Sequence, residues 1–162
     1  MSGGWTDTPP ICYELGGSVV NLAVTVDGEY PIKATAYVTP PSTSSPTLEA
    51  SPLILSISDE EEELKLFDLD DITNYSDPTA SGALLKAALI VSGIVSLDKK
   101  NVTLRDQIYA IVGGSLKIES RSFLPVGSGM GTSSILAGAV LAVLGHASRN
   151  PYSNDQLIHA VL

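Results

Sequence analysis

Apolar and polar residues alternate in the first part of the chain, and apolar residues recur at helical spacing later. Alternation over residues 18–26 and 32–38, on either side of Asp27-Gly28, predicts a β-hairpin, because Asp-Gly is a favoured two-residue hairpin turn. Short apolar runs at residues 53–57 and 64–67 predict two further strands. The first fifteen residues contain paired glycines and prolines, so they are predicted to be a loop.

Helical spacing begins after residue 76. Asp77 is suited to an N-cap and Pro78 to the first helical position, and the apolar residues continue to about Val95, so a buried helix is predicted there. The remaining predicted elements are a short helix over 104–111, a strand over 116–122, an apolar helix over 133–144 ending near Gly145, and a last helix opened by a capping box of Ser153 and Gln156. This order of elements predicts an α+β fold.

Composition and charge exclude several classes of protein. The chain has 162 residues, of which 44% are hydrophobic, and this composition excludes a disordered protein. A single cysteine, Cys12, excludes a small disulfide-stabilised scaffold, and we expect this residue to be a small buried hydrophobe. The net charge of −9 argues against nucleic acid or an anionic membrane as a partner. However, eight acidic residues and one basic residue fall between Asp59 and Asp71, so the rest of the chain is nearly neutral and can bind an anion.

No segment is suited to export or to crossing a membrane. The longest apolar run, residues 135–145, is far shorter than the ~20 residues that a spanning helix needs. We therefore expect a soluble, cytoplasmic protein.

The strongest candidate for a ligand site follows the last predicted strand. Glycines that let a backbone approach a phosphate precede hydroxyl residues at a helix start, where N–H groups and the helix dipole favour an anion. It is not a P-loop, because Thr132 rather than lysine follows Gly131, and it is not a dinucleotide-binding fingerprint. The spacing leaves two interpretations, a phosphate-binding loop or a glycine-rich turn with ordinary Ser/Thr capping. The candidate residues are Gly127, Ser128, Gly129, Met130, Gly131, Thr132, Ser133 and Ser134.

A second candidate site lies in the N-terminal loop, where an aromatic residue precedes a carboxylate. Trp5 can stack on a sugar ring while Asp7 accepts hydrogen bonds from sugar hydroxyls, with Thr8 beside it. The alternative is a loop with an Asp-centred turn in which Trp5 covers the core. His146 and His159 have no Cys or carboxylate at metal-ligand spacing, so they are expected at helix ends or on the surface.

These two segments, in this order, resemble those of the GHMP sugar-kinase superfamily. The run Gly3-Gly4-Trp5-Thr6-Asp7-Thr8-Pro9-Pro10 resembles the sugar loop of fucokinase kinase domains, and residues 124–134 resemble the nucleotide loop of the superfamily. The resemblance covers essentially the whole chain. It implies an N-terminal GHMP kinase domain, similar in fold to the second domain of ribosomal protein S5, with a sugar loop at 3–17 and an ATP-phosphate loop at 124–134.

The resemblance also implies a reaction. In such kinases the γ-phosphoryl group of ATP moves, with Mg²⁺, to the anomeric hydroxyl of L-fucose and gives fucose 1-phosphate, chiefly through positioning and charge stabilisation. Ser133 falls at the position of the Mg²⁺-coordinating serine and Thr132 at that of a phosphate-contacting hydroxyl. Asp7, with Trp5 and Thr8 beside it, falls where the family holds sugar hydroxyls. The implied partners are ATP and a sugar, and no specific protein partner is inferred.

Some parts of the family pattern are missing. These are the strand before the sugar loop, the downstream glycine-rich segment with the catalytic aspartate, and the C-terminal domain. The resemblance places that aspartate beyond Leu162, and Asp106-Gln107 lacks flanking glycines, so no catalytic residue is assigned. We therefore expect a domain truncated at both ends that binds Mg-ATP weakly and does not turn over alone. The alternatives are a D-glycero-D-manno-heptose 7-phosphate kinase-like fragment, in which Trp5 would be unusual, and a non-catalytic ATP- or sugar-binding module.

Overall fold

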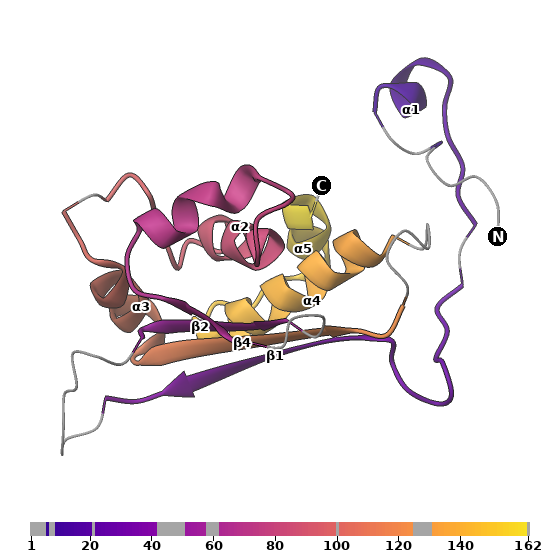
Figure 1. Ribbon diagram of the computed structural model, residues 1–162. Coiled ribbons are helices and arrows are strands. Elements are labelled where there is room, and N and C mark those ends of the chain that lie inside the picture. The colour runs from indigo at the N-terminus through magenta and orange to yellow at the C-terminus, as the bar shows by residue number, and fades with distance from the viewer. Residues whose placement is uncertain are drawn as a thin grey trace.

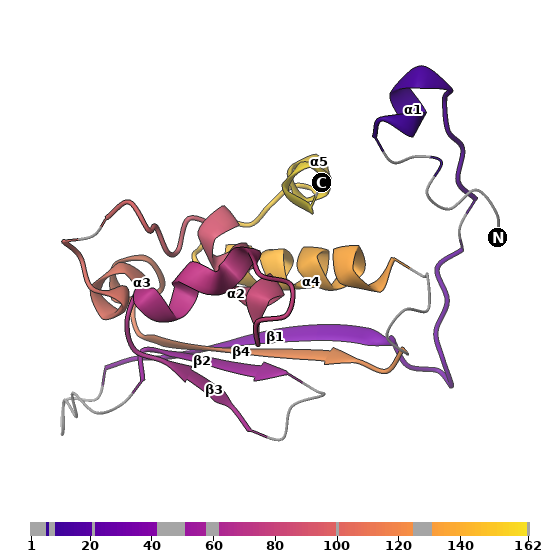
Figure 2. The same cartoon turned by 45° about the horizontal axis from the view of Figure 1, so that its top comes forward.

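A sheet of four strands carries helices on one of its faces (Figures 1 and 2). The computed structural model describes residues 6, 9–20, 22–41, 51–57, 62–99, 101–124 and 131–161. Within these residues the strands are β1 (Ile32–Thr39), β2 (Leu53–Ile57), β3 (Leu64–Leu66) and β4 (Ser115–Ser122), in the spatial order β1-β4-β2-β3. The helices are α1 (Ile11–Glu14), the 3₁₀ helix η1 (Asp70–Ser76), α2 (Ala83–Val91), α3 (Leu104–Val112), α4 (Thr132–Ala147) and α5 (Asn154–Val161). Strands β2 and β4 are parallel, and the other neighbouring pairs are antiparallel. The predicted α+β fold is confirmed.

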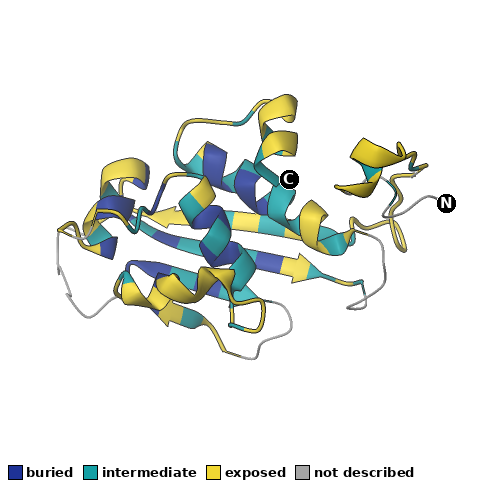
Figure 3. Cartoon of the chain, turned by 90° about the horizontal axis from the view of Figure 1, so that it is seen from above, coloured by how far each residue is buried: buried dark blue, intermediate teal, exposed yellow. Residues whose placement is uncertain are grey.

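The core lies between the sheet and the helices. Side chains alternate between the two faces of a strand, so Leu116 and Ile118 of β4 point toward the helices and are buried. They join buried residues of α2 and α4, such as Leu89 and Leu144. Figure 3 shows this burial along the middle of the sheet, whereas α1 is largely exposed. Helix α4 packs across β1 and β4, and this contact fixes where its first turn lies.

The opposite face of the sheet is polar. Lys117 Nζ lies 2.8 Å from carboxylate oxygens of both Glu63 and Glu119. These hydrogen bonds raise the pKa of Lys117 and lower the pKa of Glu119. The acidic window therefore meets the sheet at Glu63, and residues 58–61 lie outside the described part of the chain.

The predicted hairpin forms only at its turn. Asp27 and Gly28 have positive φ angles of 51° and 82°, and Val26 and Glu29 exchange two backbone hydrogen bonds of 2.9 Å. The strand predicted over residues 18–26 is wrong. The described residues of this segment run away from the sheet as an arm that ends in α1 (Figure 1). Residues 11–14, part of the predicted loop, form one helical turn, and Cys12 on it is only half-buried.

The hydrogen bonds of β1 explain why the hairpin does not continue. In a regular hairpin extended from the Val26–Glu29 pair, the backbone of Pro31 would face the strand predicted over residues 18–26, because bonded pairs recur every second residue. The carbonyl of Pro31 instead accepts a 2.9 Å hydrogen bond from the amide of Phe123, just beyond β4. That side of β1 is therefore occupied by a strand from much later in the chain.

Three helix boundaries also differ from the predictions. Asp77 does not cap a helix, because its Oδ1 accepts hydrogen bonds from the amide (2.9 Å) and hydroxyl (2.7 Å) of Thr79 and so stabilises a turn. Helix α2 begins later, after Gly82, whose φ is 69°, and it ends at Val91 rather than near residue 95. Helix α4 continues through Gly145 to Ala147.

The last helix begins as predicted. The Ser153 amide donates to Gln156 Oε1 (2.9 Å), and the Gln156 amide donates to Ser153 Oγ (3.3 Å), which confirms the capping box. His146 lies in the last turn of α4 and His159 in the last turn of α5, and both are exposed as expected.

Candidate functional site

The first turn of α4 lies at the end of the sheet where β4 stops. Gly131 occupies the N-cap with φ 70° and ψ 24°, in the left-handed region, and a Cβ built on it would meet nothing within 4 Å. The residue is therefore glycine for its backbone conformation and not for lack of space. Its carbonyl accepts the first helical hydrogen bond, from the Ile135 amide at 3.1 Å.

This helix start is suited to an anion. Gly131 has no side chain and gives no capping oxygen to the amides of the first turn, which in any α-helix lack acceptors within the helix. Thr132 is half-buried, whereas Ser133 and Ser134 are exposed. The first turn contains no acidic residue. A negatively charged group there would gain hydroxyl donors as well as the favourable end of the dipole of a sixteen-residue helix.

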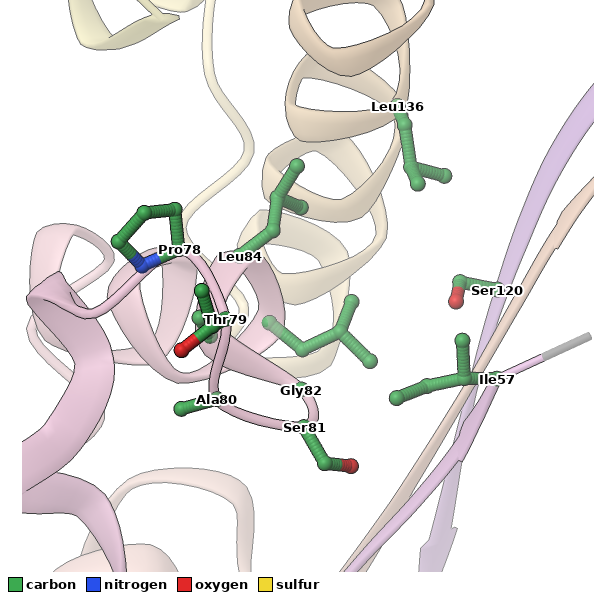
Figure 4. Close-up of a pocket in the computed structure, with 11 residues that line it drawn as sticks. Ile57, Pro78, Thr79, Ala80, Ser81, Gly82, Leu84, Ser120 and Leu136 are labelled. Carbon is green, nitrogen blue, oxygen red and sulfur yellow. The ribbon is translucent and has the colours of Figure 1, made fainter. Parts of the chain in front are cut away.

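A cleft of about 350 Å³ opens beside this turn, between the sheet, α4 and the segment that leads into α2 (Figure 4). Its lining residues are Ile57, Pro78, Thr79, Ala80, Ser81, Gly82, Ala83, Leu84, Leu85, Ser120 and Leu136. None of these residues is charged. The cleft is therefore suited to an uncharged part of a ligand, and a charged part would lie outside it, for example at the helix start.

Local interactions hold the wall of the cleft. The hydrogen bonds between Asp77 and Thr79 stabilise its outer turn and lower the pKa of Asp77. A Cβ on Gly82 would lie 3.0 Å from Leu55 Cδ1, so the absence of a side chain lets this segment approach β2. Behind it, the buried Lys86 donates a 2.8 Å hydrogen bond to Asn74 Oδ1, which ties α2 to η1.

The sheet side of the cleft contains one hydroxyl group. Ser120 on β4 is 3% exposed, and its side chain projects toward the cleft (Figure 4). On the neighbouring strands it is flanked by Ala34 and Ile57. Within the described residues no hydrogen bond involves the Ser120 hydroxyl. Sequence reasoning missed this residue, and its only signal there is a serine on the apolar face of a strand.

The candidate residues from sequence fall into two groups. Those from Gly131 to Ser134 lie together at the start of α4, with Gly131 at the N-cap and the three hydroxyl residues in the first turn. Their role in binding stays a prediction. The others lie outside the described residues: Trp5, Asp7, Thr8, Gly127, Ser128, Gly129 and Met130. Leu162, beyond which the catalytic aspartate is expected, also lies outside the described residues. The position of a catalytic carboxylate therefore stays a prediction.

Two kinds of feature are absent from the described residues. The described part of the chain contains no group of three or more His, Cys, Asp or Glu residues that could hold a metal ion. Among the same residues, no helix has the length and apolar character needed to cross a membrane.

Comparison with known sequences identifies the relatives of the chain. Residues 91–162, which include β4 and all of the described part of α4, match the family described as GHMP kinases N terminal domain. The bifunctional fucokinase/GDP-fucose pyrophosphorylase of Arabidopsis thaliana is 34% identical over 161 residues, which are 99% of this chain and 13% of that protein. The L-fucokinase/L-fucose-1-P guanylyltransferase of Bacteroides fragilis is 32% identical over 146 residues, which are 89% of this chain and 14% of that protein. The chain therefore spans about one seventh of the length of these relatives.

Solved structures show the same fold. A structure of mevalonate kinase has a TM-score of 0.53 to this chain, and that of the Methanococcus jannaschii mevalonate kinase has a TM-score of 0.54. In each comparison the sequences are 17% identical, and the matched region covers 80% of this chain and 36% of the mevalonate kinase chain. The chain is thus an N-terminal domain of the GHMP kinase family, related to the fucokinase domains of bifunctional fucokinase proteins.

Proposed function

We propose that this domain binds Mg-ATP and L-fucose for transfer of the γ-phosphoryl group to the anomeric hydroxyl, which gives fucose 1-phosphate. The observation that carries the proposal is the similarity of 99% of the chain to a fucokinase, together with a helix start built for an anion. Both curated relatives are named as fucokinases, which favours fucose over a heptose phosphate. The cytoplasmic location expected from the sequence stays a prediction.

The triphosphate is assigned to the glycine-rich segment and the first turn of α4. Gly127, Ser128, Gly129 and Met130 would provide backbone amides, and the helix start would add those of the first turn with the hydroxyls of Thr132 and Ser134. Mg²⁺ would neutralise phosphate charge during the transfer. The exposed hydroxyl of Ser133 is the group in this turn that we assign to the metal.

The nucleoside is assigned to the cleft. Leu136 lines the cleft and follows Thr132 by four residues, which at 1.5 Å per residue is about 6 Å along the helix. A ligand with its phosphates at the start of α4 can therefore extend its base beside Leu136. The uncharged, largely apolar lining fits a base better than a phosphate.

The sugar is assigned to the N-terminal loop. Trp5 would pack on the apolar face of fucose, and Asp7, with Thr8 beside it, would accept hydrogen bonds from hydroxyls of the sugar. Positioning the anomeric hydroxyl in line with the γ-phosphate is the main task of such a loop, because phosphoryl transfer depends chiefly on geometry and charge stabilisation.

Isothermal titration of this chain with Mg-ATP and with L-fucose tests the proposal. We expect saturable binding of both, and Asp7→Asn should weaken L-fucose binding with Mg-ATP affinity unchanged. Equal losses for both ligands would make Asp7 a structural residue. An absence of binding for both ligands would contradict the proposed function.

A further inference from the structure

Ser120 breaks the apolar pattern of the sheet at the cleft. By alternation, the residues of β4 on the face toward the helices are Leu116, Ile118, Ser120 and Ser122, and the first two are fully buried in the core. Ser120 is nearly as enclosed, at 3% exposed, and its neighbours across the sheet are the apolar Ala34 and Ile57. An apolar residue at this position would continue the core, so the hydroxyl needs another explanation.

Every fully buried side-chain nitrogen or oxygen of the described residues has a hydrogen-bond partner. Within the described residues the side chain of Ser120 has no such partner, and Figure 4 shows it directed toward the cleft. The other hydroxyl residues of the lining, Thr79 and Ser81, have interaction partners within the protein. Thr79 donates to Asp77 on the opposite wall. The Ser120 oxygen is therefore not fully enclosed but open to the cleft that it lines, where a ligand can reach it.

We infer that Ser120 hydrogen-bonds a nitrogen or oxygen at the edge of the nucleoside base and is thus a specificity-determining residue for the nucleotide. The inference rests on the proposed function and adds a named residue to it. A base has two apolar faces and a polar edge. Its faces match Ile57 and Leu136, and its edge would meet the single hydroxyl on the sheet side. The volume, about 350 Å³, is within the range of small-molecule sites.

The test compares Ser120→Ala with Ser56→Ala in this chain. Ser56 lies on β2, one residue before Ile57, so its side chain is on the opposite face of the sheet and provides a matched control. Titrations use Mg-ATP, tripolyphosphate as a probe without a base, and L-fucose. The Kd of Ser120→Ala for Mg-ATP should rise about 3- to 10-fold, the effect of one hydrogen bond between neutral groups. Its Kd for tripolyphosphate should not change, and Ser56→Ala should alter neither.

Thermal unfolding separates this role from a structural one. Ser120→Ala should unfold at the same temperature as the parent chain or higher, because the hydroxyl has no protein bond to lose, and a clear fall would contradict the inference. An unchanged Kd for Mg-ATP would overturn it and leave the proposed function intact. Weaker L-fucose binding without an effect on Mg-ATP would also overturn it, because it would place the sugar in the cleft instead. If the parent chain binds neither Mg-ATP nor tripolyphosphate, the proposed function fails and this inference fails with it.

Discussion

Gly145 lies so close to Tyr152 that a Cβ built on the glycine would be 2.8 Å from Cδ2 of the tyrosine ring. The same Cβ would lie 3.1 Å from the carbonyl oxygen of Asn150 and 3.3 Å from Cα of Pro151. The chain after α4 therefore folds back directly over the glycine, which lets α5 pack against α4. Partial burial of the tyrosine in this turn raises the pKa of its hydroxyl.

Gly145→Ala should destabilise the domain even though alanine is the better helix former. Alanine gains about 1 kcal/mol in a helix interior, but overpacking against a ring and a backbone typically costs about 1–3 kcal/mol. We expect a net loss of about 1 kcal/mol, or some 2–4 °C in Tm for a domain of about this size, measured by thermal unfolding. The control is Gly138→Ala in the same helix. Its Cβ would make only an ordinary 3.7 Å contact with Val161, so this change should raise Tm. A higher Tm for both variants would contradict the expected clash and show that the turn between α4 and α5 shifts enough to accommodate the added methyl group.

Local signals explain why the later elements are predictable from sequence. Helix α3 begins where Thr103 Oγ1 accepts a 3.1 Å hydrogen bond from the Asp106 amide, and α5 begins at the Ser153–Gln156 pair. These contacts span three residues and can be recognised in the sequence. The predicted hairpin is wrong for the opposite reason. Its turn is local and forms, but the edge of β1 that it needs is bonded to the chain at Phe123, which local pattern cannot reveal.

The candidate site divides in the same way. The start of α4 is encoded in one contiguous run, so its glycine and hydroxyl residues can be found from spacing. The cleft is not contiguous, because β2, the segment before α2, β4 and α4 each contribute to its lining. Ser120 can be recognised as part of the cleft only once the sheet register is known, because the register places it beside Ile57. No spacing rule connects two such positions.

Gly131→Ala should weaken Mg-ATP binding more than it affects stability. An L-residue at φ 70° is strained by about 1–2 kcal/mol, and the first turn of α4 can relieve this strain by shifting the amides that would meet the phosphates. Gly93→Ala is the control, because Gly93 has φ 75°, equally open surroundings and a place just beyond α2. Both variants should lose similar stability, but only Gly131→Ala should raise the Kd for Mg-ATP. Equal Kd values would remove the helix start from the site.

Asp77 should titrate below its ordinary value of 3.8, because the hydroxyl and amide of Thr79 both donate to its carboxylate and lower its pKa. Because the pKa is lower in the folded state, the ionised carboxylate stabilises the turn at pH values above the unfolded-state pKa. This stabilisation is lost as the pH falls through the folded-state pKa. The turn should therefore be unaffected between about pH 8 and about pH 5 and loosen only below about pH 4. NMR titration of the carboxyl carbon checks this. Thr79→Val, which removes the hydroxyl donor, should move the midpoint upward, and an unchanged midpoint would contradict the assignment.

Ser133→Ala should weaken the binding of ATP only when Mg²⁺ is present. Ser133 and Ser134 are adjacent, exposed hydroxyl residues in the first turn of α4, so alanine at either position should preserve the helix. If Ser133 contacts the metal, its loss should raise the Kd for Mg-ATP roughly tenfold, a typical cost for removing a supporting group from a metal site, and leave the Kd for metal-free ATP unchanged. Ser134→Ala, assigned to phosphate, should weaken both forms by the same factor. Titration calorimetry with and without Mg²⁺ measures all four constants. Equal behaviour of the two variants would mean that the hydroxyls contact phosphate alone and that the metal is held elsewhere.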